Sequence, residues 1–171
     1  MFHHAITRLV WCAIGAATGI GLALWLVAPP ASAFFLAPLG GSTIFLFGLT
    51  RAPAAQPRAL FGGHLGGALI GIACYQALGD ALWVYVLAQV ATFVYMLAAR
   101  VVHPPAGANP ILMVFAHAQW SALVQPVLVG VLCLAAVACV WSRLYPGLAR
   151  YPVSVWEPSP PKMLWGGWDA G

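Results

Sequence analysis

Two long apolar stretches of this chain are each interrupted by a short string of prolines, glycines and small polar residues. The first string is Pro38-Leu-Gly-Gly-Ser-Thr-Ile44 and the second is Pro105-Ala-Gly-Ala-Asn-Pro-Ile111. An interrupted helix within a bilayer leaves backbone N–H and C=O groups without partners unless protein or a polar cavity surrounds them. Paired interruptions in two halves of a membrane protein therefore point to a binding site or pore near the membrane midplane.

The composition is that of an integral membrane protein. Of the 171 residues, 63% are hydrophobic and only 6% are charged, and the mean hydropathy is +0.91. The uncharged runs, each with room for at least one spanning helix of roughly 20 residues, cover residues 9–50, 59–79, 81–99 and 101–142. We therefore expect the lipid bilayer to be the main partner of this chain, and no soluble domain of useful size remains.

We expect an all-α polytopic fold with four intact transmembrane helices and two broken segments. The intact helices are expected at about 9–28, 59–79, 81–99 and 121–142, and the broken segments at about 31–50 and 103–119. Pro29-Pro30 is expected to end the first helix. Its apolar run exceeds the roughly 7–15 residues of a signal-peptide core, so a retained helix is expected.

The helix, broken segment and helix pattern occurs twice, over residues 9–79 and 81–142. A shift of 67 positions places Pro38 on Pro105, Gly40 on Gly107, Ser42 on Asn109 and Ile44 on Ile111. The similarity predicts two three-segment pseudo-repeats. The alternative is that a proline, a glycine and small residues form a common loop string, with no repeat.

The seven Lys and Arg residues distinguish crossing from re-entrant segments. If both broken segments dip back, Arg8 and Arg143 lie on one face while Arg51 and Arg100 lie on the other. If both segments cross, all seven cations lie on one side. The positive-inside rule favours crossing, with both termini cytoplasmic in a bacterial inner membrane. Six crossings would give the two repeats inverted topology.

The transmembrane domain is expected over residues 1–145, and an extended tail over 146–171. The tail combines prolines with Trp156, Trp165 and Trp168 and lacks helical periodicity. Its tryptophans suit the membrane surface. The net charge of +4 suits anionic lipid headgroups better than nucleic acid.

The residues after each interruption suit the start of a helix. Ser42, and Asn109 followed by proline, match a side-chain acceptor at the N-cap position. Free N–H groups and positive dipole ends would then face a cavity and favour an anion. Gly40, Gly41 and Gly107 would let the backbone turn and let a ligand approach it closely. The alternative is that both interruptions only kink helices for packing.

Histidines supply the titratable groups near these strings. His103 opens the second string and could bind an anion, carry a proton or cap a helix. His64 lies inside an expected helix, where an ionisable side chain needs an interior partner. His117 is more typical of an interface, and His3 and His4 of a terminal tail. Because no carboxylate lies near the histidines, we expect no metal site and no cofactor.

Glycine-rich faces indicate close helix packing. Gly63, Gly67 and Gly71 recur at four-residue spacing in one expected helix, and Gly15 and Gly19 in another. Such faces let helices approach closely. The pattern fits contact between these two helices and equally fits a homo-oligomer.

Membrane-embedded catalysis lacks a sequence signature here. There is no Ser/His/Asp set, paired carboxylate, HExxH string or phosphate-binding loop. The four cysteines lie in apolar segments and are typical of small buried hydrophobic residues. We therefore do not expect an enzyme.

Three strings carry a resemblance to a known family: His103-Pro104-Pro105-Ala-Gly-Ala, Ala37-Pro-Leu-Gly-Gly-Ser42 and Gly63-His64. Through them the chain resembles the HPP family of integral membrane proteins, over roughly residues 5–145. Members of that family are usually described as having four transmembrane helices. Plastid and cyanobacterial relatives are associated with nitrite transport, so the resemblance implies a small-anion transporter or channel. The resemblance extends to His103, Pro104, Pro105 and Gly107, and more loosely to Pro38, Gly40, Ser42 and His64.

These observations together predict a membrane transporter or channel for a small anion, with nitrite as the leading substrate. The expected binding groups are backbone amides after Gly41 and Gly107 with the side chains of Ser42, Thr43 and Asn109. His103 and His64 would couple occupancy to a proton. The alternative function is a membrane scaffold or sensor subunit that transports nothing and packs against a partner through its glycine-rich helices.

Overall fold

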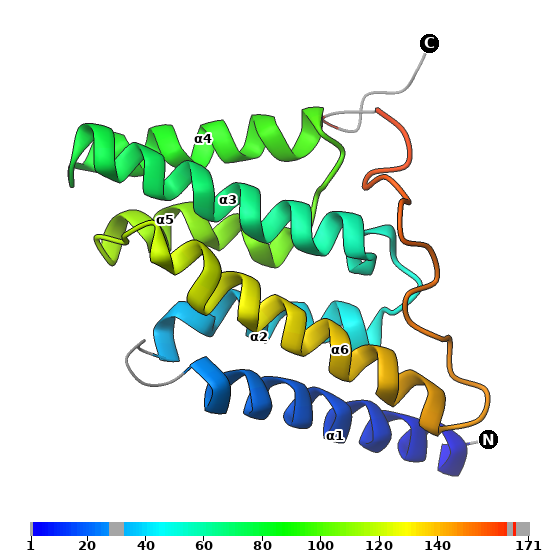
Figure 1. Ribbon diagram of the computed structural model, residues 1–171. Coiled ribbons are helices and arrows are strands. Elements are labelled where there is room, and N and C mark those ends of the chain that lie inside the picture. The colour runs from blue at the N-terminus through cyan, green and yellow to red at the C-terminus, as the bar shows by residue number, and fades with distance from the viewer. Residues whose placement is uncertain (1, 28–32, 164–165, 167–171) are drawn as a thin grey trace.

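The computed structural model describes residues 2–27, 33–163 and 166, which form a bundle of helices (Figure 1). No β-strand occurs in these residues. The α-helices are α1 (Phe2–Val27), α2 (Ala37–Thr43), α3 (Pro57–Leu78), α4 (Leu82–Ala98), α5 (Asn109–Phe115) and α6 (Val129–Leu144). Short 3-10 or π segments adjoin them: η1 (Ala33–Leu36), η2 (Ile44–Gly48), η3 (Pro53–Ala55), η4 (Pro104–Ala108) and η5 (Leu123–Leu128).

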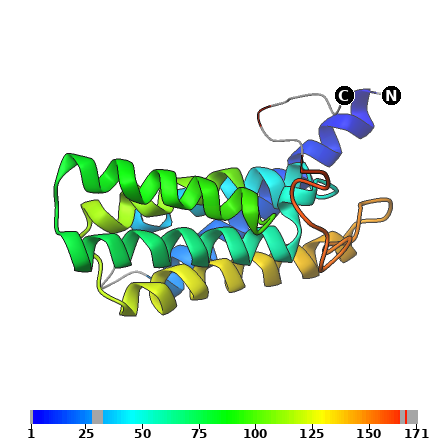
Figure 2. The same ribbon diagram turned by 90° about the horizontal axis from the view of Figure 1, so that it is seen from above.

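Successive segments run in alternating directions along the bundle (Figure 1), and the view from above shows them side by side (Figure 2). Helix α1 packs mainly against α6, whereas α3 packs against α4 and α5. The two short helices lie in the interior, since α2 contacts η4 and α5 contacts both α3 and α4. The two strings singled out in the sequence therefore meet inside the bundle.

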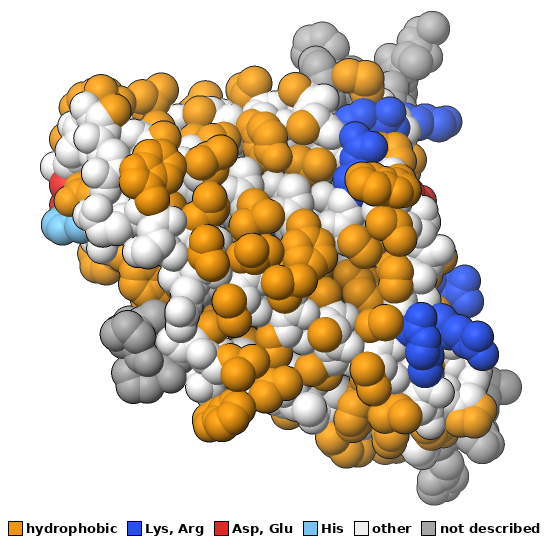
Figure 3. Space-filling model, viewed as in Figure 1, with side chains coloured by type: hydrophobic (Ala, Val, Ile, Leu, Met, Phe, Trp, Pro, Cys, Tyr) orange, Lys and Arg blue, Asp and Glu red, His pale blue; other side chains and the backbone are white. Residues whose placement is uncertain are grey.

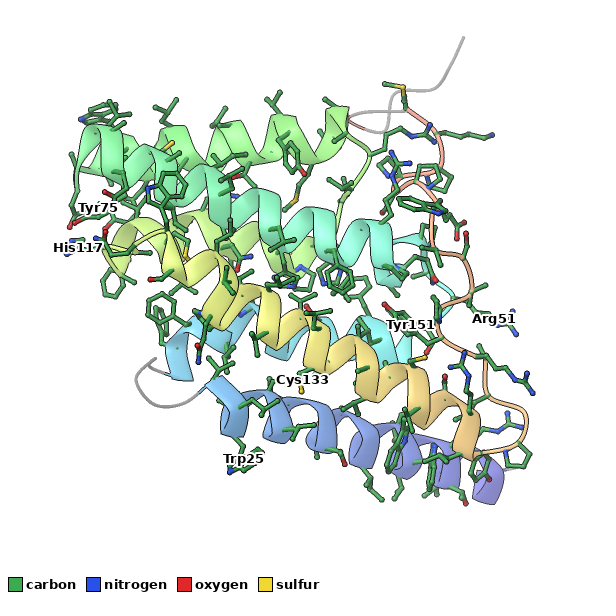
Figure 4. The ribbon with its side chains drawn as sticks, viewed as in Figure 1. Trp25, Arg51, Tyr75, His117, Cys133 and Tyr151 are labelled. Atoms are coloured by element: carbon green, nitrogen blue, oxygen red, sulfur yellow. The ribbon has the colours of Figure 1, made fainter. Side chains whose placement is uncertain are left out.

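Lysine and arginine side chains gather at one end of the bundle, called here the cationic end (Figure 3). Arg8 is near the start of α1, Arg58 is in the first turn of α3, and Arg143 is in the last turn of α6. Arg51 lies at the same end, and His117 lies at the opposite end (Figure 4). This is the distribution expected if both broken segments run from end to end. The pseudo-repeat relation between the halves stays a prediction.

Two of the described helices, Ala5–Val27 and Leu123–Leu144, are long and apolar enough to cross a bilayer. Two further apolar helices, Phe34–Gly48 and Leu82–Ala98, are shorter. The boundaries of α3 and α4 lie close to the expected 59–79 and 81–99. The expected count of four intact transmembrane helices remains a prediction.

The first interruption was predicted to be unwound, but the structure shows it to be helical. Pro38, Gly40 and Gly41 lie inside α2, which continues directly into the π-helical turn η2. Proline is tolerated in the first turn because its missing N–H needs no partner there. The amides after Gly41 therefore lie beyond the first turn, where helical N–H groups bond to the preceding turn.

The last predicted helix, expected intact over 121–142, is kinked. Gln125 has non-helical backbone angles (φ −128°, ψ 113°) and precedes Pro126. Proline removes one helical hydrogen bond and forces the preceding residue out of the helical region. The proline within this apolar run was the available signal for the kink.

The glycine-rich faces are used within the chain, and they do not meet each other. A Cβ atom on Gly63 would lie 3.0 Å from the Cβ atom of His103, and one on Gly71 would lie 2.7 Å from the Cα atom of Pro110. On α1, a Cβ atom at Gly15 would lie 2.9 Å from the Phe47 ring. The glycines of α3 thus accommodate η4 and α5, while those of α1 accommodate η2 and α6.

Residues 145–163, called here the strap, form an extended segment across the cationic end (Figure 1). The side-chain carbonyl of Gln56 accepts hydrogen bonds from the backbone N–H groups of Val153 (2.9 Å) and Ser154 (3.1 Å). Ser159 exchanges backbone bonds with Arg100 and Val102. Pro29-Pro30, Trp165 and Trp168 lie outside the described residues, as do the side chains of His3 and His4.

Candidate functional site

Ser42 is the centre of a buried polar cluster. Its Oγ atom lies 2.8 Å from Nε2 of His64 and 2.8 Å from Nε2 of His103. The three side chains come from α2, α3 and the start of η4, and none is more than 1% exposed. One hydroxyl group is therefore shared by two imidazole rings in the interior of the bundle.

Two further groups fix the outer nitrogens of the two rings. The Nδ1 atom of His103 lies 2.6 Å from the carbonyl oxygen of Ala54. The side-chain amide nitrogen of Asn109 lies 3.1 Å from Nδ1 of His64 and 2.9 Å from the carbonyl oxygen of His64. We call Ser42, His64, His103 and Asn109 the Ser42 cluster.

The partners determine where each proton resides when both rings are neutral. A carbonyl oxygen only accepts, so His103 carries its proton on Nδ1 and its Nε2 accepts from the Ser42 hydroxyl. The Asn109 amide donates to Nδ1 of His64, so His64 carries its proton on Nε2 and donates to Ser42. Every donor and acceptor that bridges these side chains is then satisfied, and the hydrogen bonds run in one direction from Asn109 to Ala54.

The Ser42 hydroxyl has a second acceptor available. Its Oγ atom lies 3.2 Å from the carbonyl oxygen of Pro38, one turn earlier in α2. If the hydroxyl rotates toward Pro38, its oxygen can accept from both Nε2 atoms at once. The cluster can therefore take up one additional proton on His103 while the backbone stays in place.

Within the described residues, no hydrogen bond or ring contact joins this cluster to a charged side chain. The two imidazole rings also contact aromatic rings: the ring centroids of His64 and His103 lie 5.1 Å apart, and the Phe45 centroid lies 5.4 Å from that of His103. Within the described residues, no group of three His, Cys, Asp or Glu side chains could hold a metal ion. The chemistry available here is hydrogen bonding and proton transfer.

Of the predicted site residues, the structure brings Ser42, His64, His103 and Asn109 into one cluster. Pro38 contributes its carbonyl oxygen as an acceptor for Ser42. Pro105 packs closely against Gly41: a Cβ atom built on Gly41 would lie 3.0 Å from the Cβ atom of Pro105. The other predicted residues lie outside the cluster: Gly40, Thr43, Pro104 and Gly107. Thr43 bonds the carbonyl of Gly40 at 2.7 Å.

The two predicted N-caps are wrong. Helix α2 begins at Ala37 and α5 at Asn109, and neither start has a side-chain cap hydrogen bond. Ser42 lies in the last turn of α2, and Asn109 donates across to α3. Both side chains bond the imidazole groups of other segments. A buried imidazole without a partner is costly, whereas the free N–H groups at a helix start can be satisfied in other ways.

Sequence reasoning missed Ala54, which supplies only a backbone carbonyl and so leaves no signal in its side chain. It also missed Gln56, which is fully buried and whose amide nitrogen donates to the carbonyls of Thr50 (2.8 Å) and Ala52 (3.1 Å). A glutamine between an apolar loop and Pro57 was the available signal. Gln56 fixes the loop that presents the Ala54 carbonyl to His103.

The opposite end of the bundle has its own polar cluster, exposed to solvent. His117 Nε2 lies 2.8 Å from a carboxylate oxygen of Asp80, and the Tyr85 hydroxyl donates to the other oxygen at 2.8 Å. The His117 ring stacks on Tyr75 with centroids 5.0 Å apart (Figure 4). Hydrogen bonds from His117 and then Tyr85 hold the pKa of Asp80 below its ordinary value. This cluster joins the α3–α4 turn to the turn after α5.

Comparison with known proteins identifies the family to which these strings belong. The chain matches the family described as HPP, transmembrane region, over residues 2–152. The protein belongs to the HPP transmembrane family. It is also 28% identical over 131 residues to a transmembrane protein of Dictyostelium discoideum. That alignment covers 72% of this chain but 42% of the Dictyostelium protein, so the chain spans about two fifths of that relative's length. No solved structure matches this HPP protein.

Proposed function

We propose that this HPP protein is the membrane-spanning unit of a small-anion transporter or channel, with nitrite as the leading substrate. The observation that carries the proposal is the convergence of two imidazole Nε2 atoms on one oxygen atom, each at 2.8 Å, in the buried Ser42 cluster. An ionisable pair inside a membrane bundle is expensive to keep and marks ion pathways and proton relays.

The donor geometry favours an anion. After His103 takes up a proton, both Nε2–H groups point to the position that the Ser42 oxygen occupies. An anion oxygen that displaces the Ser42 hydroxyl would receive the same two hydrogen bonds, and charge-assisted bonds of this kind are the stronger class. Binding of the anion and uptake of the proton would then occur together, which keeps the buried net charge near zero.

The cations at one end suit the same role. A surface of one charge sign raises the local concentration of ions of opposite sign. The positive-inside rule supports a cytoplasmic location for this end and for both termini. A bacterial inner membrane as the location is part of the proposal. The inverted relation between residues 9–79 and 81–142, and assembly into a homo-oligomer, belong to the same proposal.

A scaffold or sensor that transports nothing is the second candidate. It is favoured by the tight contact between the two interruptions, where a Cβ atom on Gly41 would lie 3.0 Å from Pro105. In that function the Ser42 cluster would only hold α2, α3 and η4 together. The two functions differ in whether water and ions reach Ser42.

Nitrite flux into proteoliposomes tests the proposal. We expect flux with the parental protein, and loss of flux with His103→Ala and Asn109→Ala. His117→Ala is the matched control, because this histidine lies on the opposite end and outside the cluster. Parental flux rates in both cluster variants would show that the proposed site is wrong.

Thiol accessibility distinguishes a conduit from a scaffold. Ser42→Cys, in a background whose four native cysteines are alanine, changes little volume and places a thiol at the centre of the cluster. A hydrophilic thiol reagent should modify it if the protein conducts ions. Gly40→Cys is the control, since a side chain there meets nothing within 4 Å. Modification of Gly40→Cys alone would favour the scaffold.

A further inference from the structure

A second set of polar groups lies on α4, outside the Ser42 cluster. Gln89 and Thr92 are three residues apart and share one face of the helix. Thr92 is 1% exposed. Neither its hydroxyl oxygen nor the side-chain carbonyl oxygen of Gln89 has a hydrogen-bond partner within the described structure. Both residues line a cavity of about 190 Å³, called here the α4 cavity.

The second interruption forms the other wall of the α4 cavity, through Val102, Pro104 and Gly107. Val102 and Pro104 are the two chain neighbours of His103, whose own ring faces Ser42 and Ala54. The rest of the lining is apolar: Phe93, Met96 and Leu97. The α4 cavity therefore lies directly behind the backbone that carries His103.

Thr92 and Asn109 of the Ser42 cluster both approach Gly67, where the backbone carbonyl oxygen of Ala106 also lies, 3.1 Å from a Cβ atom built on that glycine. A Cβ atom on Gly67 would lie 3.4 Å from Cγ2 of Thr92 and 3.5 Å from Cβ of Asn109. On the far side, a Cβ atom on Gly107 would meet nothing within 4 Å. The wall between the cavity and the cluster is thus built from small residues and backbone.

Unpartnered polar groups are costly in an apolar interior, because they lose their bonds to water and gain none. In a membrane bundle such groups persist where a ligand or water supplies the missing partner. The threonine hydroxyl can donate, and rotation of the Gln89 amide presents N–H groups in place of its oxygen. Two neutral donors beside the apolar lining of the α4 cavity suit a small anion that has shed part of its water.

We propose that the α4 cavity is a binding site for a small anion, which passes from there across Gly67 and Gly107 to the Ser42 cluster. This inference rests on the proposed function and adds a holding site and an access side to it. The cavity volume is several times the roughly 30 Å³ share of one water molecule. A small anion and accompanying waters therefore fit together.

Transport kinetics of Thr92→Val and Gln89→Leu test the α4 cavity. The nitrite concentration at half-maximal uptake into proteoliposomes should rise about tenfold in each variant, the cost of one hydrogen bond to a charged partner. Thr18→Val is the matched control, because the Thr18 hydroxyl already bonds the carbonyl of Ile14 at 2.9 Å. A structural role alone predicts unchanged half-saturation and equal or higher thermal stability.

Ligand protection gives a second readout that does not require transport. Gly107→Cys, in the cysteine-free background, should react with a hydrophilic thiol reagent, and sodium nitrite should slow that reaction. Gly40→Cys serves as the control that nitrite leaves unchanged. If the reaction of Gly107→Cys instead slows as the protein-to-lipid ratio rises and does not respond to nitrite, a second copy of the chain covers the cavity. That result would overturn the anion site.

The outcomes separate the two proposals. In one outcome, His103→Ala stops flux, both α4 variants keep the parental half-saturation concentration, and nitrite does not protect Gly107→Cys. The α4 cavity is then not a site, and the proposed function stands. If the parental protein carries no nitrite but nitrite protects Gly107→Cys, the site stands and the proposed function fails. Absence of both flux and protection contradicts both proposals.

Discussion

The Nε2 atom of His103 lies 2.8 Å from the hydroxyl oxygen of Ser42, although 61 positions separate the two residues. Ser42 lies in the first string and His103 lies two residues before the second, so this contact joins the two interrupted segments directly. Because His64 bonds the same oxygen from α3, removal of one hydroxyl leaves two buried imidazoles without their common partner.

Ser42→Ala should therefore destabilise the protein, by about 1–3 kcal/mol for the unsatisfied groups left behind. The measurement is thermal or chemical unfolding of the purified protein in detergent. Thr43→Ala is the matched control, since that hydroxyl bonds only the carbonyl of Gly40 in its own turn. Equal effects of the two substitutions would contradict the shared role of the Ser42 hydroxyl.

Gly41→Ala should loosen the contact between the two interruptions. The added methyl would lie 3.0 Å from the Pro105 Cβ atom, and overpacking of this kind costs about 1–3 kcal/mol. Gly40→Ala, where a Cβ atom meets nothing within 4 Å, should be neutral or slightly stabilising in a helix. Unfolding of both variants in detergent compares them, and a Gly41→Ala protein as stable as the parent would show that η4 can move away.

Gly71→Ala should disrupt the packing of α3 on α5. A Cβ atom there would lie 2.7 Å from both Cα and O of Pro110, and backbone atoms cannot move aside as a flexible side chain can. We expect reduced yield of folded protein in detergent, measured by size-exclusion chromatography. Gly21→Ala on α1, with open space around its Cβ position, should match the parent.

Acid should weaken the cluster at the end opposite the cationic end. Bonding to His117 and Tyr85 depresses the pKa of Asp80 in the folded protein. The ionised carboxylate therefore stabilises the fold above about pH 4, its ordinary pKa, and that contribution is lost as the pH falls through the lower folded value. Asp80→Asn should show a shallower fall of the unfolding temperature between about pH 5 and pH 3 than the parent.

Glu157→Gln is the control for this acid dependence, because Glu157 lies on the strap at the other end. It should keep the parental steepness. A Glu157→Gln protein that flattens the acid response as much as Asp80→Asn would show that Asp80 is not its source.

Gln56→Leu should release the strap. Its amide bonds both Val153 and Ser154 of the strap and the carbonyls of Thr50 and Ala52, and leucine replaces none of these bonds. Trypsin should then cut after Arg150 several-fold faster, which mass spectrometry of a digestion time course measures. Gln76→Leu, which loses one bond to the Ala118 carbonyl at the opposite end, should keep the parental rate.

The helices follow from the sequence because uncharged runs and their flanking prolines and glycines define them. Expected boundaries of 59–79 and 81–99 lie within two residues of α3 and α4 at each end. The interior of a broken segment is different, since helical, 3-10 and π turns all tolerate Pro38, Gly40 and Gly41. Tertiary packing decides which of these turns forms, and the local sequence pattern does not reveal that choice.

The candidate site was only partly predictable for a related reason. Ser42, His64, His103 and Asn109 stand out as polar residues among apolar ones, so the sequence marks them. Their connections depend on how segments far apart in the chain face each other, which hydrophobic periodicity does not reveal. A local rule therefore predicted caps for Ser42 and Asn109, although their partners lie on other segments.

The strap gives the molecule unequal resistance to opening at its two ends. At the cationic end, Gln56, Arg58 and Ser159 hold the strap to neighbouring segments through hydrogen bonds, some between backbone groups and some from side chain to backbone. At the opposite end, the described links between segments include the solvent-exposed contact of His117 with Asp80, to which the Tyr85 hydroxyl also donates, and the bond from Gln76 to the Ala118 carbonyl. We therefore expect local opening of the helices to start at the end away from the strap, where fewer bonds must break.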